Sequence, residues 1–150
     1  EWSQPGLAKS LHMSASEVNH GLKRLAKAKL YNPVTKKCLR RSLAEFLIHG
    51  AKYAFPTEPG SLRHGIPTAH CAPPLSKALV FDPADCYVWE DRTGSVVGQT
   101  IEPIYSSAPK AAKEDPRLHE LLALLDALRV GRAREVKLAR DAISERILHG

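Results

Sequence analysis

Apolar residues recur at helical spacing in the last quarter of the chain. The first stripe, at positions i, i+3, i+4, i+7 and i+10, consists of Leu118, Leu121, Leu122, Leu125 and Leu128. After Gly131 a second stripe consists of Val136, Ala139, Ile143 and Ile147. Asp115 before Pro116 is a typical helix start. These patterns predict a helical hairpin over residues 116–148, which caps the domain or pairs with a second copy of the chain.

Two more stretches follow a helical pattern. Residues 39–54 form an apolar-periodic segment that ends before Pro56, and they predict one helix. Residues 3–31 are helical in pattern and basic. No apolar run approaches the ~18–20 residues of a membrane span.

Residues 56–108 have a different character, because most of the eleven prolines lie there or close by. Residues 56–76 predict an extended surface loop. The β-prone runs 86–89 and 95–101 flank a loop that ends in Gly94, and they predict a β-hairpin. Residues 79–81 are a candidate third strand.

The expected fold is therefore mainly α with a small β component. We expect two parts: a helix-turn-helix segment over residues 1–38, and an accessory body over residues 39–150. The body contains the helix 39–54, the proline-rich loop and β-hairpin of residues 56–108, and the helical hairpin of residues 116–148.

Positive charge is concentrated at the start of the chain. Residues 1–41 contain nine of the 22 Lys and Arg but only two of the 16 Asp and Glu, a net charge of +7 that leaves −1 for residues 42–150. Localised positive charge favours contact with a phosphate backbone, because neutralised phosphates release counterions. A solvated basic face that only aids solubility explains the charge equally well, so the residue pattern beneath it must decide.

The residues of this basic segment predict two helices that cross at a tight turn. Ala8 is the small residue that a close crossing requires. Leu7 and Leu11 line the inner face of the first helix, and Met13 fills the gap after the turn. Val18, Leu22 and Leu25 form the inner stripe of the second helix.

The start of the second helix has a specific signal. Ser14 is a favourable N-cap, and Glu17 three residues later completes a capping box. Over residues 3–31 this pattern resembles the helix-turn-helix of winged-helix transcriptional regulators of a prokaryotic type.

The chain departs from that family pattern at two places. His12 occupies the turn position that is usually glycine; histidine tolerates the left-handed conformation better than most residues do. A helix-turn-helix also needs a third helix to close its core. Residues 39–54, a helix before Glu1, or a partner chain are the three possible sources. The segment after Asn32 is too short for a long wing.

The resemblance implies that residues 14–27 contain the recognition helix. Its outward positions, which would face the bases of duplex DNA, are Ser14, Ala15, Ser16, Asn19, His20 and Lys23. Asn19 can pair with adenine through two hydrogen bonds, and Ser16 or His20 can reach base edges or phosphates. Lys9, Lys23, Arg24 and Lys27 are better placed as phosphate contacts.

Cysteine and histidine invite other interpretations. Cys38, Cys71 and Cys86 are an odd number without a C-x-x-C pair, so we expect neither a disulfide framework nor a zinc site, and we expect a cytoplasmic protein. His64, His70 and Cys71 match no common zinc spacing. A rigid proline loop is the favoured interpretation there, with a metal-dependent enzyme as a weak alternative.

The sequence thus predicts a sequence-specific duplex DNA-binding transcriptional regulator, a homodimer rather than an enzyme, with no cofactor, metal or membrane partner. The alternative is an antitoxin-like protein-interaction module. Such a module would dock an acidic partner through its basic N-terminal helices or through residues 63–74.

Overall fold

The computed structural model describes residues 1–150 and shows a mixed α/β protein in which helices dominate. In chain order the elements are α1 (Gln4–Leu11), α2 (Ala15–Lys27), β1 (Tyr31–Asn32), β2 (Lys37–Cys38), α3 (Arg40–His49), α4 (Ala51–Ala54), β3 (Leu62–Thr68), the 3₁₀ turn η1 (Ala69–Cys71), α5 (Leu75–Ala78), β4 (Tyr87–Glu90), β5 (Val96–Thr100), α6 (Ala108–Glu114), α7 (Pro116–Val130) and α8 (Ala133–His149).

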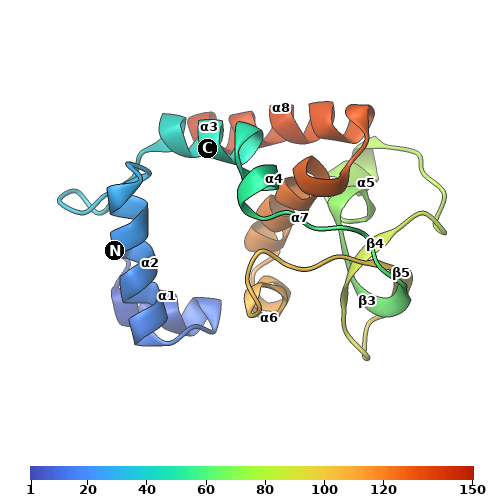
Figure 1. The fold of residues 1–150 in the computed structure, drawn as a ribbon, viewed down its shortest axis with the longest axis horizontal. Coiled ribbons are helices and arrows are strands. Elements are labelled where there is room, and N and C mark those ends of the chain that lie inside the picture. Colours follow the sequence, from blue (N-terminus) through green and yellow to red (C-terminus); the bar gives the residue numbers. More distant parts are fainter.

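The elements form an N-terminal unit and a body (Figure 1). The N-terminal unit consists of α1, α2 and the β1–β2 hairpin, and it lies to one side. In the body, α3 lies along α8, α7 runs through the centre, and β3, β4 and β5 lie at the far end. No helix is long and apolar enough to cross a bilayer.

Helix α7 is the centre of the hydrophobic core. Every residue from position 122 to 128 is buried, so α7 is enclosed on all sides rather than along the single predicted stripe. Leu124 and Leu128 pack with Ala139 and Ile143 of α8, whereas Leu122 packs with Trp89 on the β side. The predicted hairpin of residues 116–148 is present as α7 and α8, and its apolar stripes face the core. Asp115 caps α7 as expected, by accepting hydrogen bonds from the backbone N–H groups of the first turn.

The predicted helix over residues 39–54 is interrupted at Gly50, which separates α3 from the short α4. A Cβ atom at this position would lie 3.0 Å from the Phe46 ring. α3 contacts α8 and α7, and α4 contacts α7, so residues 39–54 form two helices that meet at Gly50 instead of one continuous helix.

The β region differs from the expected hairpin. β3 pairs antiparallel with both other strands: Leu62–Gly65 with β5, and Gly65–Thr68 with β4. β4 and β5 pair parallel with each other, so the three strands close into a small barrel. Gly65 lies where β3 changes partners, and a Cβ atom there would come within 2.2 Å of the Trp89 carbonyl oxygen. The prediction of a β4–β5 hairpin was wrong, because β3 takes the place of the antiparallel partner.

Two loop predictions were also wrong. Residues 56–76 do not form a surface loop, since they contain β3 and η1, with Thr68, Ala69 and His70 buried. Residues 79–81 form no strand.

The cysteines also require a correction. Cys71 and Cys86 form a disulfide with their Cα atoms 5.6 Å apart, and only Cys38 is free. The expectation of unpaired cysteines, on which the cytoplasmic assignment depended, therefore does not hold. The fold brings η1 beside the start of β4, and no local spacing signals that approach.

A buried charged pair joins the helices to the barrel. The Asp126 carboxylate accepts hydrogen bonds from Thr68 Oγ1 of β3 (2.7 Å), from Trp89 Nε1 of β4 (2.9 Å) and from Arg129 (2.7 Å). Arg129 also donates to the carbonyl oxygens of Phe55 and Glu102, at 2.7 and 2.9 Å. Burial raises the pKa of the Asp126 carboxyl, and the three donors oppose that shift.

We expect Asp126→Ala to lower the free energy of unfolding by about 3–5 kcal/mol, because Arg129, Trp89 and Thr68 would lose their shared buried acceptor. Urea unfolding of the purified protein measures the change. Asp141→Ala, which removes an exposed carboxylate from α8, is the matched control and should change stability by about 0.5 kcal/mol or less. Equal effects of the two substitutions would contradict the role assigned to Asp126.

Candidate nucleic-acid interface

The turn between α1 and α2 has the geometry that its residues predict. His12 is left-handed, with φ 54° and ψ 42°, and its backbone N–H closes the end of α1. The Met13 N–H donates to the carbonyl oxygen of Ala8 at 3.0 Å, Ala8 is buried, and α1 and α2 are in contact. A small residue at position 8 therefore lets the two helices approach each other.

The start of α2 is fixed by the predicted capping box. Ser14 Oγ accepts from the Glu17 N–H at 3.0 Å, and Glu17 Oε1 accepts from the Ser14 N–H at 2.9 Å. Both hydrogen bonds satisfy N–H groups that lack an intrahelical partner. The two hydrogen bonds fix the residue at which α2 begins, and therefore which side chains lie on its exposed face.

The outward face of α2 is polar and cationic. Ser16, His20, Lys23 and Lys27 lie opposite the buried Val18, at the spacing of one helix face, and all four are exposed. Ser14, Ala15 and Arg24 are also exposed, and Asn19 is half-buried.

The predicted phosphate contacts are free in the structure. Lys9 projects from α1, and Lys23, Arg24 and Lys27 project from α2. None of the four cations forms an ion pair or a side-chain hydrogen bond within the chain. Because no internal carboxylate neutralises them, they remain available to an external anion.

A short β-hairpin follows α2 where a wing would lie. It has two residues in each strand, with Tyr31 opposite Cys38 and Asn32 opposite Lys37. The Asn32 side chain accepts from the N–H groups of Val34 and Thr35, so the turn is closed locally. This hairpin adds Lys36 and Lys37 to the basic surface, and the sequence signalled both only through the charge of residues 1–41.

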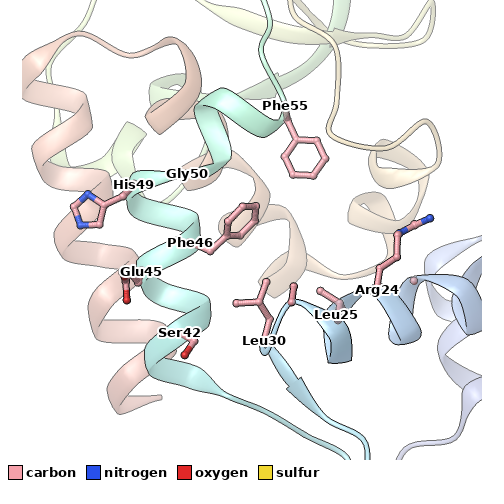
Figure 2. Close-up of a pocket in the computed structure, with 11 residues that line it drawn as sticks. Arg24, Leu25, Leu30, Ser42, Glu45, Phe46, His49, Gly50 and Phe55 are labelled. Atoms are coloured by element: carbon pink, nitrogen blue, oxygen red, sulfur yellow. The ribbon is translucent and has the colours of Figure 1, made fainter.

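The inner face of α2 is only partly covered. Val18 is 4% exposed, but Leu25, which the stripe places inside, is 39% exposed. Leu25 borders a groove of ≈ 760 Å³ that lies between α2 on one side and α3 and α4 on the other. In Figure 2, Phe46 and Phe55 point toward Leu25 and Leu30 across this groove.

Residues 39–54 do not supply the closing third helix. α3 packs on α8 and α7, and it lies across the open groove from α2. The body instead contacts the N-terminal unit through α6 and its N-cap: Ser107 Oγ donates to the Leu11 carbonyl oxygen at 2.8 Å, and His12 Nε2 lies 2.8 Å from Glu114 Oε2. The structure thus removes one of the three sources proposed for a third helix.

The other candidate cluster is dispersed by the fold. His64 Nδ1 lies 3.2 Å from the Gly94 carbonyl oxygen, His70 Nε2 lies 2.6 Å from that of Asp85, and Cys71 is in the disulfide. No group of three His, Cys, Asp or Glu side chains is placed to hold a metal ion. Residues 63–74 lie largely in β3 and η1, so they do not form the free recognition loop of the alternative interpretation.

Comparison with known protein families, with curated proteins and with solved structures finds no match, so function must be inferred from the residues of this chain.

We expect Ser14→Ala to destabilise α2 by about 1 kcal/mol, because the Glu17 N–H loses its acceptor. Amide hydrogen exchange in the first turn of α2 measures the effect, which should appear as about fivefold faster exchange. Ser16→Ala, in the same turn but without a cap contact, should leave these rates unchanged. Equal acceleration in both variants would show that the capping box does not hold the helix start.

Proposed function

We propose that the chain is a sequence-specific, duplex DNA-binding transcriptional regulator that acts as a homodimer. The observation that supports this most directly is the outward face of α2. Its exposed polar and cationic side chains lie on one side of a helix whose start is fixed by a capping box. α1, the His12 turn and the β1–β2 hairpin accompany this helix in the chain order of a helix-turn-helix followed by a short wing.

The side chains of α2 divide into two roles under this proposal. Asn19, Ser16 and His20 reach base edges when α2 lies in the major groove, as Asn can pair with adenine through two hydrogen bonds. Lys23, Arg24 and Lys27 contact phosphates and set the register of the helix on the duplex. Lys9 adds a phosphate contact from α1.

Removing phosphate contacts tests the electrostatic part of the proposal. We expect Lys23→Ala/Arg24→Ala to reduce the slope of log K against log salt concentration by about 2, because two counterions fewer are released. Fluorescence anisotropy with a mixed-sequence duplex, titrated at two or more salt concentrations, measures this slope.

The control for this experiment is Arg134→Ala/Arg140→Ala, which removes the same charge from α8. Neither of these arginines forms an ion pair within the chain. Their removal should leave the slope unchanged. Failure of the native protein to bind duplex at low salt would contradict the proposal and favour an acidic protein as the partner of these helices.

Base recognition is tested separately. After an operator has been selected from random duplexes, Asn19→Ala should weaken operator binding by about 1–3 kcal/mol and relax the preference at one base pair. Binding to mixed-sequence duplex should change little, since the phosphate contacts remain. Equal losses on both duplexes would show that Asn19 does not contact a base.

A further inference from the structure

A second groove lies between the β1–β2 hairpin and the ends of α7 and α8. It has a volume of ≈ 770 Å³. Its charged lining consists of five cations, Lys36, Lys37, Arg40, Arg117 and Arg146, and one carboxylate, Glu120. The cations come from the hairpin, the start of α3, the start of α7 and the end of α8.

Most of this positive charge is not neutralised inside the chain. Glu120 Oε2 accepts from Arg146 at 3.1 Å, and Arg40 donates to the Gly150 carbonyl oxygen at 2.5 Å. Lys36, Lys37 and Arg117 form no ion pair and no side-chain hydrogen bond. Cations gathered without counter-charge repel one another, so such a groove is stabilised by a bound polyanion.

The dipoles of α3 and α7 do not explain why an arginine lies in the first turn of each helix. Arg40 and Arg117 lie in the first turns of α3 and α7, where the helix dipole is positive and disfavours cations. No side chain caps the start of α3, so its first N–H groups have no side-chain acceptor. A helix start beside arginines offers hydrogen-bond donors and positive charge to the same anion.

The groove adjoins the proposed DNA-binding helices. Trp2, which precedes α1, lines it, and the Trp2 indole N–H donates to the Lys36 carbonyl oxygen at 3.1 Å. The Trp2 ring also packs against Tyr31, which begins the hairpin after α2. The start of α1 and the hairpin are therefore held together at the edge of the groove.

We infer that this groove binds the sugar-phosphate backbone of the duplex whose major groove α2 occupies. The inference rests on the proposed function and extends it: Arg117 and Arg146, from the part of the chain with a net charge of −1, join the hairpin lysines in one backbone contact. The DNA-binding surface then includes the body as well as the N-terminal unit.

Cys38 provides a direct test, because it is exposed, lines the groove and is the one free cysteine. Its alkylation by neutral iodoacetamide, without reductant so that the disulfide stays intact, is followed by mass spectrometry with and without duplex. Bound backbone should slow the reaction by up to roughly tenfold at a free duplex concentration of ten times Kd.

The control moves the free thiol from the groove to a distant site. In the variant Cys38→Ser/Val80→Cys, the thiol replaces a side chain that is 95% exposed and lies near the opposite end of α8. Duplex should leave its alkylation rate unchanged. An unchanged rate at Cys38 under conditions where anisotropy shows saturated binding would overturn the inference.

A charge-matched pair of variants separates this inference from the proposed function. Lys37→Gln/Arg117→Gln should lower the salt slope by about 2, whereas Arg134→Gln/Arg140→Gln should not change it. If duplex binding depends on Lys23 and Arg24 but the salt slope of Lys37→Gln/Arg117→Gln is unchanged, only the assignment of the groove is overturned. Absence of duplex binding by the native protein overturns both, and protection of Cys38 by single-stranded DNA alone overturns the duplex assignment.

Discussion

The body of this protein depends on the buried pair formed by Asp126 and Arg129. Burying two charges is expensive, and their mutual attraction offsets that cost only when the remaining donors and acceptors are also satisfied. Here the Asp126 carboxylate accepts hydrogen bonds from side chains of β3 and β4. The Arg129 guanidinium donates to backbone carbonyl groups just after α4 and β5. The pair therefore fixes α7, the barrel and the end of α4 relative to one another.

This arrangement also shapes the region that faces the N-terminal unit. Arg129 holds the Phe55 carbonyl group, and the Phe55 ring forms one wall of the groove beside α2. The N-terminal unit, in contrast, meets α6 through polar contacts near the molecular surface. The body is thus tied together by buried hydrogen bonds, whereas the N-terminal unit meets α6 through part-buried and exposed ones.

Local signals in the sequence predicted α1, α2, α7 and α8, but neither the break at Gly50 between α3 and α4 nor the short helices α5 and α6. The capping box at Ser14 and Glu17, the left-handed His12 and the N-cap at Asp115 each depend on neighbours within a few residues, and all three are present. β3 could not be predicted in this way. Its glycine and proline residues are typical of a loop, and only pairing with two distant strands makes Leu62–Thr68 a strand.

The same distinction applies to the candidate site. The charge and periodicity of residues 1–41 identified the outward face of α2, because a helix face is a local property. Arg117 and Arg146 gave no such signal, since only the packing of α7 and α8 beside the hairpin brings them to its lysines. The Cys71–Cys86 disulfide was missed for the same reason.

His12 has two roles: its backbone forms the turn between α1 and α2, and its side chain contacts Glu114 of α6. Its left-handed backbone costs about 1 kcal/mol relative to glycine, the residue best suited to that conformation. Glycine, however, has no side chain to reach Glu114, so the residue best suited to the turn would remove one of the two hydrogen bonds that join this region to α6 and its N-cap. His12 therefore links the conformation of the turn between α1 and α2 to the contact of the N-terminal unit with α6, a connection that a glycine turn would lack.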